Sequence, residues 1–189
     1  MPIERKSDKF KLKKWFVVYA PDIFNKAMIC EIPAASEKAV KDRNVVISLD
    51  ALTHNPSNMN MNIKLKINNA ENGAAYTSIK SIEMLYSYIR SLIHRHKSLV
   101  NVYVPIATKD NKNIVVKLII ITRSKVVHSK LVDMRKKSEA FIKEKVPALP
   151  FDEFVKAVID KRFQNELASI IKPIAAVSTV EMKKLEIKQ

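Results

Sequence analysis

Two stretches in which apolar and polar residues alternate constrain the fold of this chain most. In MNIKLKI, residues 61–67, every second residue is apolar and the residues between are asparagine or lysine. Successive side chains of a β-strand point to opposite faces, so the pattern predicts a half-buried strand with a polar, cationic outer side. The alternation recurs in residues 100–106, which are followed by the polar loop TKDNKN and then by the apolar run IVVKLIII. Residues 100–121 are therefore predicted to form a β-hairpin.

Weaker signals predict more strands and three helices. Runs rich in β-branched and aromatic residues predict strands in KWFVVYAP (14–21), AMICEI (27–32) and NVVISL (44–49). Apolar residues at helical spacing predict helices from about Ile82 through the His-Arg-His stretch, from about Val127 to Pro147, and from about Phe151 to Pro173. The segment TVEMKKLEIK near the end is either a last strand or a basic tail.

The predicted elements give an α+β fold, with a mainly antiparallel β-barrel core and about three flanking helices. At 189 residues the chain is long enough for one domain with a core and too short for two ordinary ones. We expect a basic N-terminal arm at 1–12, a single α+β barrel domain at 13–175, and a C-terminal strand or basic tail at 176–189.

The charge balance indicates a polyanionic partner. Lys and Arg number 34 against 19 Asp and Glu, a formal net charge of +15. Such an excess favours nucleic acid or an acidic membrane surface. Compositional drift toward lysine is the alternative, since 27 of the basic residues are lysine. No lysine-rich amphipathic helix at either terminus supports the membrane interpretation, and the longest apolar run, residues 113–122, is far shorter than the roughly 20 residues of a membrane-spanning helix.

Cysteine and glycine usage argues against several classes of site. Cys30 is the one cysteine, which excludes an intramolecular disulfide and a cysteine-based zinc site and suggests a reducing cytoplasm. Gly73 is the one glycine, whereas phosphate-cradling and dinucleotide-binding loops need several. We therefore expect no enzyme activity, no cofactor and no metal site.

The stretch SYIRSLIHRHKSLV, residues 87–100, is the densest mixture of histidine and basic residues. Residues two apart on a helix point about 200° apart, so His94 and His96 cannot bind one metal ion there. The helical period places His96 on the buried side with Ile89. Arg90, His94 and Lys97 then share one flank, which could follow a phosphate backbone. The alternative is a solvated flank without a partner.

The segment ITRSKVVHSKLVDMRKK, residues 121–137, is the strongest basic element. Its six Lys and Arg residues stand against Asp133 alone, and Ser124 and Ser129 could hydrogen-bond phosphates. An ordinary exposed helix start is the alternative, although such surfaces usually carry more balanced charge.

Four segments, in order, resemble a known family. KKWFVVYAPDIFN (13–25), YIRSLIHRHKSLV (88–100), TKDNKNIVVKL (108–118) and TRSKVVHSKLVDMRK (122–136) resemble motifs of the small-subunit ribosomal protein family called eS-one or S-three-a-e, in its archaeal form. The resemblance covers roughly residues 9–140 and fits more loosely from FDEFV onward. The family's turn glycine is replaced by Asn111, which tolerates positive φ. His94 and His96 stand where arginines are usual, and a double arginine is reduced to Arg123-Ser124-Lys125.

The resemblance implies a structural constituent of the small ribosomal subunit, located in the cytoplasm on the ribosome. It implies contacts with ribosomal RNA near its 3′ end, with neighbouring small-subunit proteins and with the messenger RNA exit region. The basic arm, helix flank and basic segment would clamp RNA, mainly by phosphate contacts and by shape. An extraribosomal RNA- or DNA-binding factor is the alternative.

Charge pattern and resemblance together give one set of candidate RNA-binding residues: Lys9, Lys11, Lys13, Lys14, Arg90, His94, Arg95, Lys97, Arg123, Lys125, Lys130, Arg135, Lys136 and Lys137. Trp15, Tyr19 and Phe24 could stack on bases, but we expect core packing for at least two of them.

Overall fold

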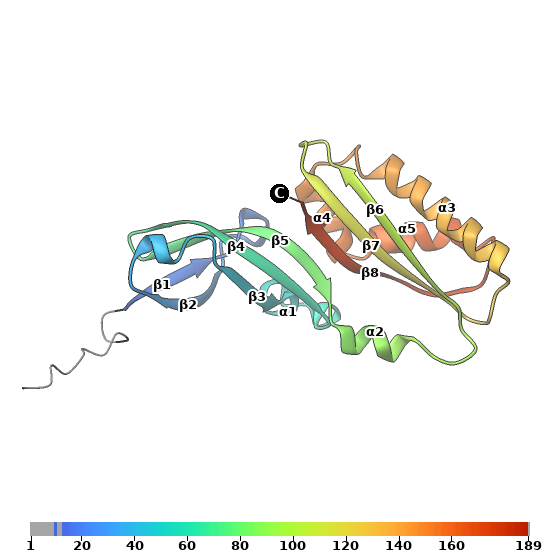
Figure 1. Ribbon diagram of the computed structural model, residues 1–189, viewed down its shortest axis with the longest axis horizontal. Coiled ribbons are helices and arrows are strands. Elements are labelled where there is room, and N and C mark those ends of the chain that lie inside the picture. The colour runs from blue at the N-terminus through green and yellow to red at the C-terminus, as the bar shows by residue number, and fades with distance from the viewer. Residues whose placement is uncertain (1–9, 11–12, 189) are drawn as a thin grey trace, which may run out of the picture.

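The computed structural model describes residue 10 and residues 13–188; residues 1–9, 11–12 and 189 lie outside the described part. Strands and helices form an elongated body, with the first five strands at one end and the last three strands with α3, α4 and α5 at the other (Figure 1). The strands are β1 (Lys14–Tyr19), β2 (Met28–Ala34), β3 (Asn44–Ser48), β4 (Met61–Glu71), β5 (Ala74–Met84), β6 (Leu99–Ala107), β7 (Asn113–Thr122) and β8 (Val177–Ile187). The α-helices are α1 (Leu49–Thr53), α2 (Tyr86–Leu92), α3 (His128–Lys145), α4 (Phe151–Ile159) and α5 (Arg162–Ile171).

The strands form one mixed sheet, in the order β2-β1-β5-β8-β7-β6, with β4 paired to both β3 and β5. All pairs are antiparallel except a short parallel one between β1 and β5. The long strand β5 pairs with β1 near its start and with β8 near its end. It therefore joins the two ends of the molecule.

The mixed α+β class is confirmed, but the expected barrel is wrong. Among the described strands, β2, β3 and β6 each pair along one edge only, so the sheet is open. Closure would bring β6 to β2 or β3, yet β5 holds those strands at opposite ends of the body (Figure 1). The described part also contains five α-helices rather than about three.

Strand β5 is the strand that the sequence prediction missed, because Ile82 was assigned to a helix. A register shift opposite Lys64 and Leu65 interrupts the alternation in β5 and hides its period of two. The loop before it carried a clear signal. Asn72 and Gly73 both have positive φ, 51° and 81°, and join β4 to β5 as a two-residue hairpin turn.

Most of the other local predictions hold. The predicted hairpin is β6 and β7, and Asn111 in its loop has φ 55°, as its replacement of glycine implied. The predicted helix from about Val127 is α3. The helix expected from Phe151 to Pro173 is two helices, separated at Lys161, whose φ is 59°. Residues 177–187 are a strand rather than a tail.

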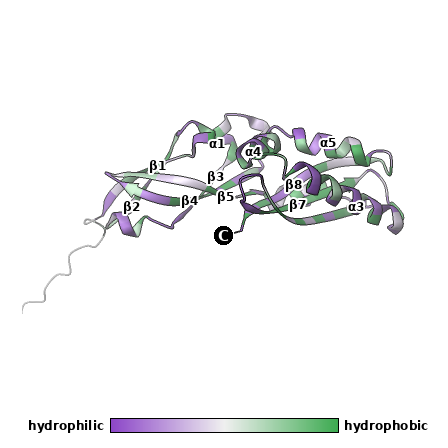
Figure 2. Ribbon diagram, turned by 90° about the horizontal axis from the view of Figure 1, so that it is seen from above, coloured by the Kyte–Doolittle hydropathy of each residue, from purple (hydrophilic) through white to green (hydrophobic). Residues whose placement is uncertain are grey.

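One hydrophobic cluster continues through both ends of the body. Ile63 and Leu65 of β4 belong to it together with Val102 of β6, Leu118 of β7 and Phe154 of α4. Helices α1, α4 and α5 lie on one side of the sheet (Figure 2). No helix of the described residues is long and apolar enough to cross a membrane.

Candidate nucleic-acid interface

The two basic segments identified from the sequence meet at one end of β6, β7 and β8. Strand β6 begins at Leu99 opposite Ile121, β7 ends at Thr122, and β8 begins at Val177 opposite Thr122. The residues just outside these strands are 94–98 and 123–130. We call these two segments together the basic end.

Thr122 fixes the two segments against each other. Its side chain is fully buried, and its Oγ1 accepts a hydrogen bond from the Ser98 N–H at 2.9 Å and donates to the Ser124 carbonyl at 2.7 Å. The Ser98 hydroxyl accepts from the Val126 N–H at 3.0 Å. The Arg123 N–H donates to the Ala176 carbonyl at 2.9 Å. The backbone of the basic end is thus held by hydrogen bonds to all three strand ends.

The basic side chains of the basic end extend outward from this backbone. His94, Arg95, Arg123, Lys125 and Lys130 are exposed, and Lys97 is half-buried. Within the part of the chain that the structure describes, none of these six side chains lies within 4.0 Å of a carboxylate. The ion pairs found there involve other cations: Lys26, Lys66, Lys145, Lys161, Arg162 and Lys184.

Helix α3 continues the cationic surface away from the basic end. Met134, Phe141 and Ile142 bury one side of the helix, and Arg135, Lys136 and Lys137 are exposed. No side chain of the described residues caps its N-terminus, and its first turn contains no acidic residue. The positive end of the helix dipole therefore adds to the charge of the basic end. Residues 90–137 contain twelve Lys and Arg against Asp110 and Asp133.

The predicted helical flank of Arg90, His94 and Lys97 is wrong. Helix α2 ends at Leu92, and Ile93 takes an extended conformation, so His94 and Lys97 lie in the turn before β6. His96 is exposed in that turn with φ 62°, rather than buried. The helical spacing of the apolar residues gave a wrong prediction because these residues belong to two elements, the end of β5 and the short helix α2.

Within α2 the expected division between core and surface holds. Ile89 is buried, and Arg90 is exposed. The Arg90 guanidinium lies 4.6 Å from the centroid of the exposed Tyr86 ring, a cation–π contact that orients it. Arg90 therefore lies on helix α2, outside the two segments of the basic end.

The candidates at the start of the chain lie far from the basic end. Lys13 and Lys14 are exposed beside β1, at the opposite end of the long axis from α3 (Figure 1). Lys9 and Lys11 lie outside the described residues. Trp15 is 57% exposed, whereas Phe24 is buried and Tyr19 stacks on Tyr76 at 6.0 Å between centroids. Of the three aromatic candidates, Trp15 is thus the one most available to a partner.

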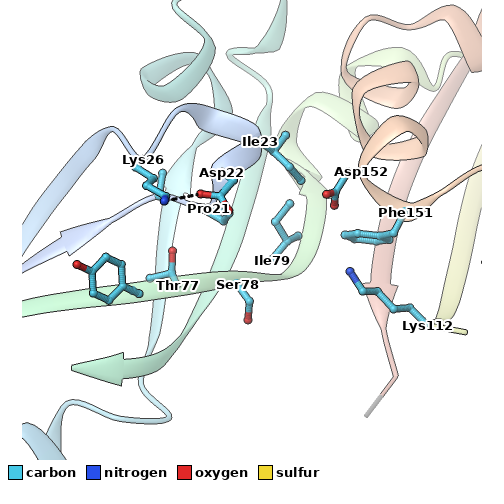
Figure 3. Close-up of a pocket in the computed structure, with 12 residues that line it drawn as sticks. Pro21, Asp22, Ile23, Lys26, Thr77, Ser78, Ile79, Lys112, Phe151 and Asp152 are labelled. Atoms are coloured by element: carbon cyan, nitrogen blue, oxygen red, sulfur yellow. Dashed lines mark ion pairs between the residues drawn. The ribbon is translucent and has the colours of Figure 1, made fainter. Parts of the chain in front are cut away.

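A cleft of about 390 Å³ lies between β5, the segment after β1 and the start of α4 (Figure 3). Three of its four charged side chains make contacts within the fold. Asp22 pairs with Lys26 at 3.1 Å, and the Lys112 ammonium lies 4.7 Å from the centroid of the Phe151 ring. Asp110, in the adjoining β6–β7 loop, accepts the Phe151 N–H at 2.8 Å. Among the described residues, no group of three or more His, Cys, Asp or Glu side chains could hold a metal ion.

A second group of charges lies on β5 and β8 and is paired within the chain. Lys184 Nζ lies 2.9 Å from Glu83 Oε1 and 3.2 Å from Glu186 Oε2; we call these three residues the charge-paired strip. The hydrogen bond to Glu83 raises the pKa of Lys184. Burial pushes the pKa of Glu83 up, but hydrogen bonds from Lys184 and Ser81 outweigh it and hold that pKa below its usual value. Sequence reasoning did not identify this strip, because β5 was not predicted.

Comparisons with known proteins agree on one family. The model of the Ribosomal S3Ae family matches residues 3–189. The small ribosomal subunit protein eS1 of Saccharolobus islandicus is 31% identical over 180 residues, which cover 95% of this chain and 86% of that protein. The proteins of the same name from Pyrobaculum aerophilum and Methanoculleus marisnigri are 29% and 26% identical. Their alignments cover 96% and 99% of this chain, and 82% and 95% of those proteins.

These matches confirm the resemblance seen in the sequence and extend it past residue 140 to the end of the chain. The C-terminal region, which resembles the family more loosely and includes β8, lies inside the match. The chain therefore belongs to the ribosomal S3Ae family.

Proposed function

We propose that this protein binds ribosomal RNA through the basic end, as a structural part of the small ribosomal subunit. One observation supports the RNA contact most: five Lys and Arg side chains and His94, on a hydrogen-bonded scaffold, lack a carboxylate partner in the described part of the chain. Family membership gives the coarser role. The protein is a small-subunit ribosomal protein with a structural role in translation, works in the cytoplasm, and is not an enzyme.

Phosphate is the ligand that this surface suits best. Lysine and arginine ammonium and guanidinium groups supply the sequence-independent part of nucleic-acid affinity, and exposed backbone N–H groups at a helix N-terminus add to it. The basic end contains two arginines, Arg95 and Arg123, which leaves few groups for bidentate base recognition. Recognition would therefore depend on RNA shape, as is usual for folded RNA.

The other candidates would extend the contact. Arg135, Lys136 and Lys137 continue the surface along α3, and Lys13 and Lys14 would touch a second part of the RNA, since they lie at the far end of the body. Placement near the 3′ end of the RNA, beside the messenger exit region and neighbouring proteins, is part of the proposal and follows from the family resemblance alone.

Footprinting on small-subunit RNA tests the proposal. The double variant Arg123→Ala/Lys125→Ala removes two unpaired cations of the basic end. Lys26→Ala/Lys145→Ala removes the same net charge from exposed lysines that pair with Asp22 and Glu166. We expect backbone protections to disappear with the first variant and to persist with the second. Equal loss of protection with both variants would refute a localised interface. In cell fractionation, recovery of the wild-type protein in fractions without small subunits would favour an extraribosomal factor.

A further inference from the structure

A second cationic site lies beside the edge strand β6, on its exposed side. Val102 and Val104 point into the core, and Tyr103 between them points outward and is 56% exposed. Beside Tyr103 the surface forms a cleft of about 310 Å³, which Lys80, Lys117 and Lys188 also line. An exposed aromatic ring is thus surrounded by three lysines from three segments.

The ring and one lysine are positioned by strand register. Tyr103 pairs directly with Lys117 across β6 and β7, and the Lys117 ammonium lies 5.6 Å from the ring centroid. This cation–π contact restrains both side chains on the sheet surface. The ring is therefore presented by a rigid element rather than by a mobile loop.

The cleft is net positive, because three lysines outnumber its one acidic residue. Glu186 lines the cleft, but Lys184 binds it at 3.2 Å within the charge-paired strip. Lys80, Lys117 and Lys188 have no carboxylate within 4.0 Å in the described part of the chain. An anionic ligand would meet three uncompensated ammonium groups around one aromatic face.

We propose that this cleft binds one unpaired nucleotide of RNA, with its base stacked on Tyr103 and its phosphates against Lys80 and Lys188. The proposal rests on the RNA-binding function proposed above and adds a second kind of contact to it. Bases in a duplex are stacked on each other, so a single exposed ring recognises a base that is splayed out. Lys117 and Thr122 lie on the same strand, roughly 17 Å apart at about 3.4 Å per residue, so the cleft is separate from the basic end.

Binding of short RNAs to the whole protein tests the site. The probes are a fluorescent single-stranded oligoadenylate and a blunt-ended RNA duplex, measured by anisotropy with the melting temperature as a check on folding. Tyr103→Ala is expected to weaken oligoadenylate binding by roughly five- to hundredfold, since stacking on one aromatic ring is lost. Tyr103→Phe keeps the ring and should stay within about twofold. Duplex binding should be unchanged by either substitution.

A second pair of variants separates this site from the basic end. Arg123→Ala/Lys125→Ala should weaken duplex binding, while oligoadenylate binding stays sensitive to Tyr103→Ala. If Tyr103→Ala leaves oligoadenylate affinity unchanged and the basic-end variant still loses duplex, the nucleotide site is refuted and the proposed function stands. A polyglutamate peptide is the probe for an acidic protein partner. If binding of this peptide depends on Lys80 and Lys188 but not on Tyr103, the proposed nucleotide site is again refuted.

Discussion

Strand β8 and the basic end organise their charges in opposite ways. On β8, Glu181 is 4% exposed and its Oε1 lies 3.0 Å from the Lys161 ammonium, while Lys184 lies between Glu83 and Glu186. At the basic end, the described cations extend into solvent with hydrogen-bonded backbone beneath them and no carboxylate within 4.0 Å. The two regions belong to one sheet, and β8 begins where the basic end lies.

The difference separates charges that serve the fold from charges left for a partner. A charge paired inside the chain loses an interaction when its partner is removed, so its substitution changes the free energy of unfolding. An exposed unpaired charge contributes little to that free energy. Its substitution should instead change affinity for a polyanion.

Lys161→Met should give the largest loss of stability. Glu181 would remain buried without its ammonium partner, and breaking such a pair costs about 3 kcal/mol of unfolding free energy at neutral pH. Urea unfolding followed by circular dichroism measures the loss. The double variant Lys161→Met/Glu181→Leu should recover most of it, because an apolar pair leaves no buried charge. Equal destabilisation of both variants would mean that packing around Lys161, rather than the ion pair, stabilises β8.

Thr122→Val should destabilise by about 1–3 kcal/mol, because the Ser98 N–H loses its side-chain acceptor and the Ser124 carbonyl its donor. RNA affinity should also fall, since residues 94–98 are no longer fixed against residues 123–126. Thr108→Val is the matched control at the other end of the same hairpin, where the buried hydroxyl makes a longer contact of 3.4 Å. An RNA affinity that Thr122→Val leaves unchanged would show that the scaffold is not needed for binding.

Lys184→Met should have the smallest effect, about 0.2–1 kcal/mol at neutral pH, because Glu83 and Glu186 are partly exposed and solvent screens the pair. The pKa of Glu83 is lowered on folding, so its contribution is present above the unfolded value of 4.5 and is lost as the pH falls through the folded pKa. Lys184 has a raised pKa, so its contribution is complete below 10.5 and is lost as the pH rises through the folded pKa. Unfolding free energies of wild type and variant should therefore converge below about pH 4.5. A difference that stays unchanged well below that pH would exclude the ion pair as its cause.

Local patterns predicted local structure well. The alternation of residues 100–106 gave the β6–β7 hairpin, Asn111 took the positive φ expected of a glycine position, and Ile89 and Arg90 divided between core and surface. Each of these depends on neighbours within a few residues. The apolar spacing from Ile82 failed because it continued by chance from a strand into a helix, and the Asn72-Gly73 turn was the signal that would have separated them.

Non-local structure could not be read from the same patterns. Whether the sheet closes depends on which strands pair with β5, and residues 81–83 pair with a strand about a hundred residues later in the chain. The sequence shows basic residues near positions 95 and 125. That these two segments lie side by side depends on the strand register that places Ser98 beside Thr122. The lysines around Tyr103 were missed for the same reason, since Lys80, Lys117 and Lys188 are far apart in sequence.

The salt dependence of RNA affinity tests most directly whether the basic end is the RNA contact. Affinity of the protein for a small-subunit RNA fragment would be measured over a series of salt concentrations for wild type, Arg123→Ala/Lys125→Ala and Lys26→Ala/Lys145→Ala. Each lost phosphate contact lowers the slope of log affinity against log salt by about 0.7–0.9. The basic-end variant should therefore lose about 1.4–1.8 from the magnitude of the slope, while the control variant keeps the wild-type slope. Equal slopes for the two variants would contradict the assignment of the basic end.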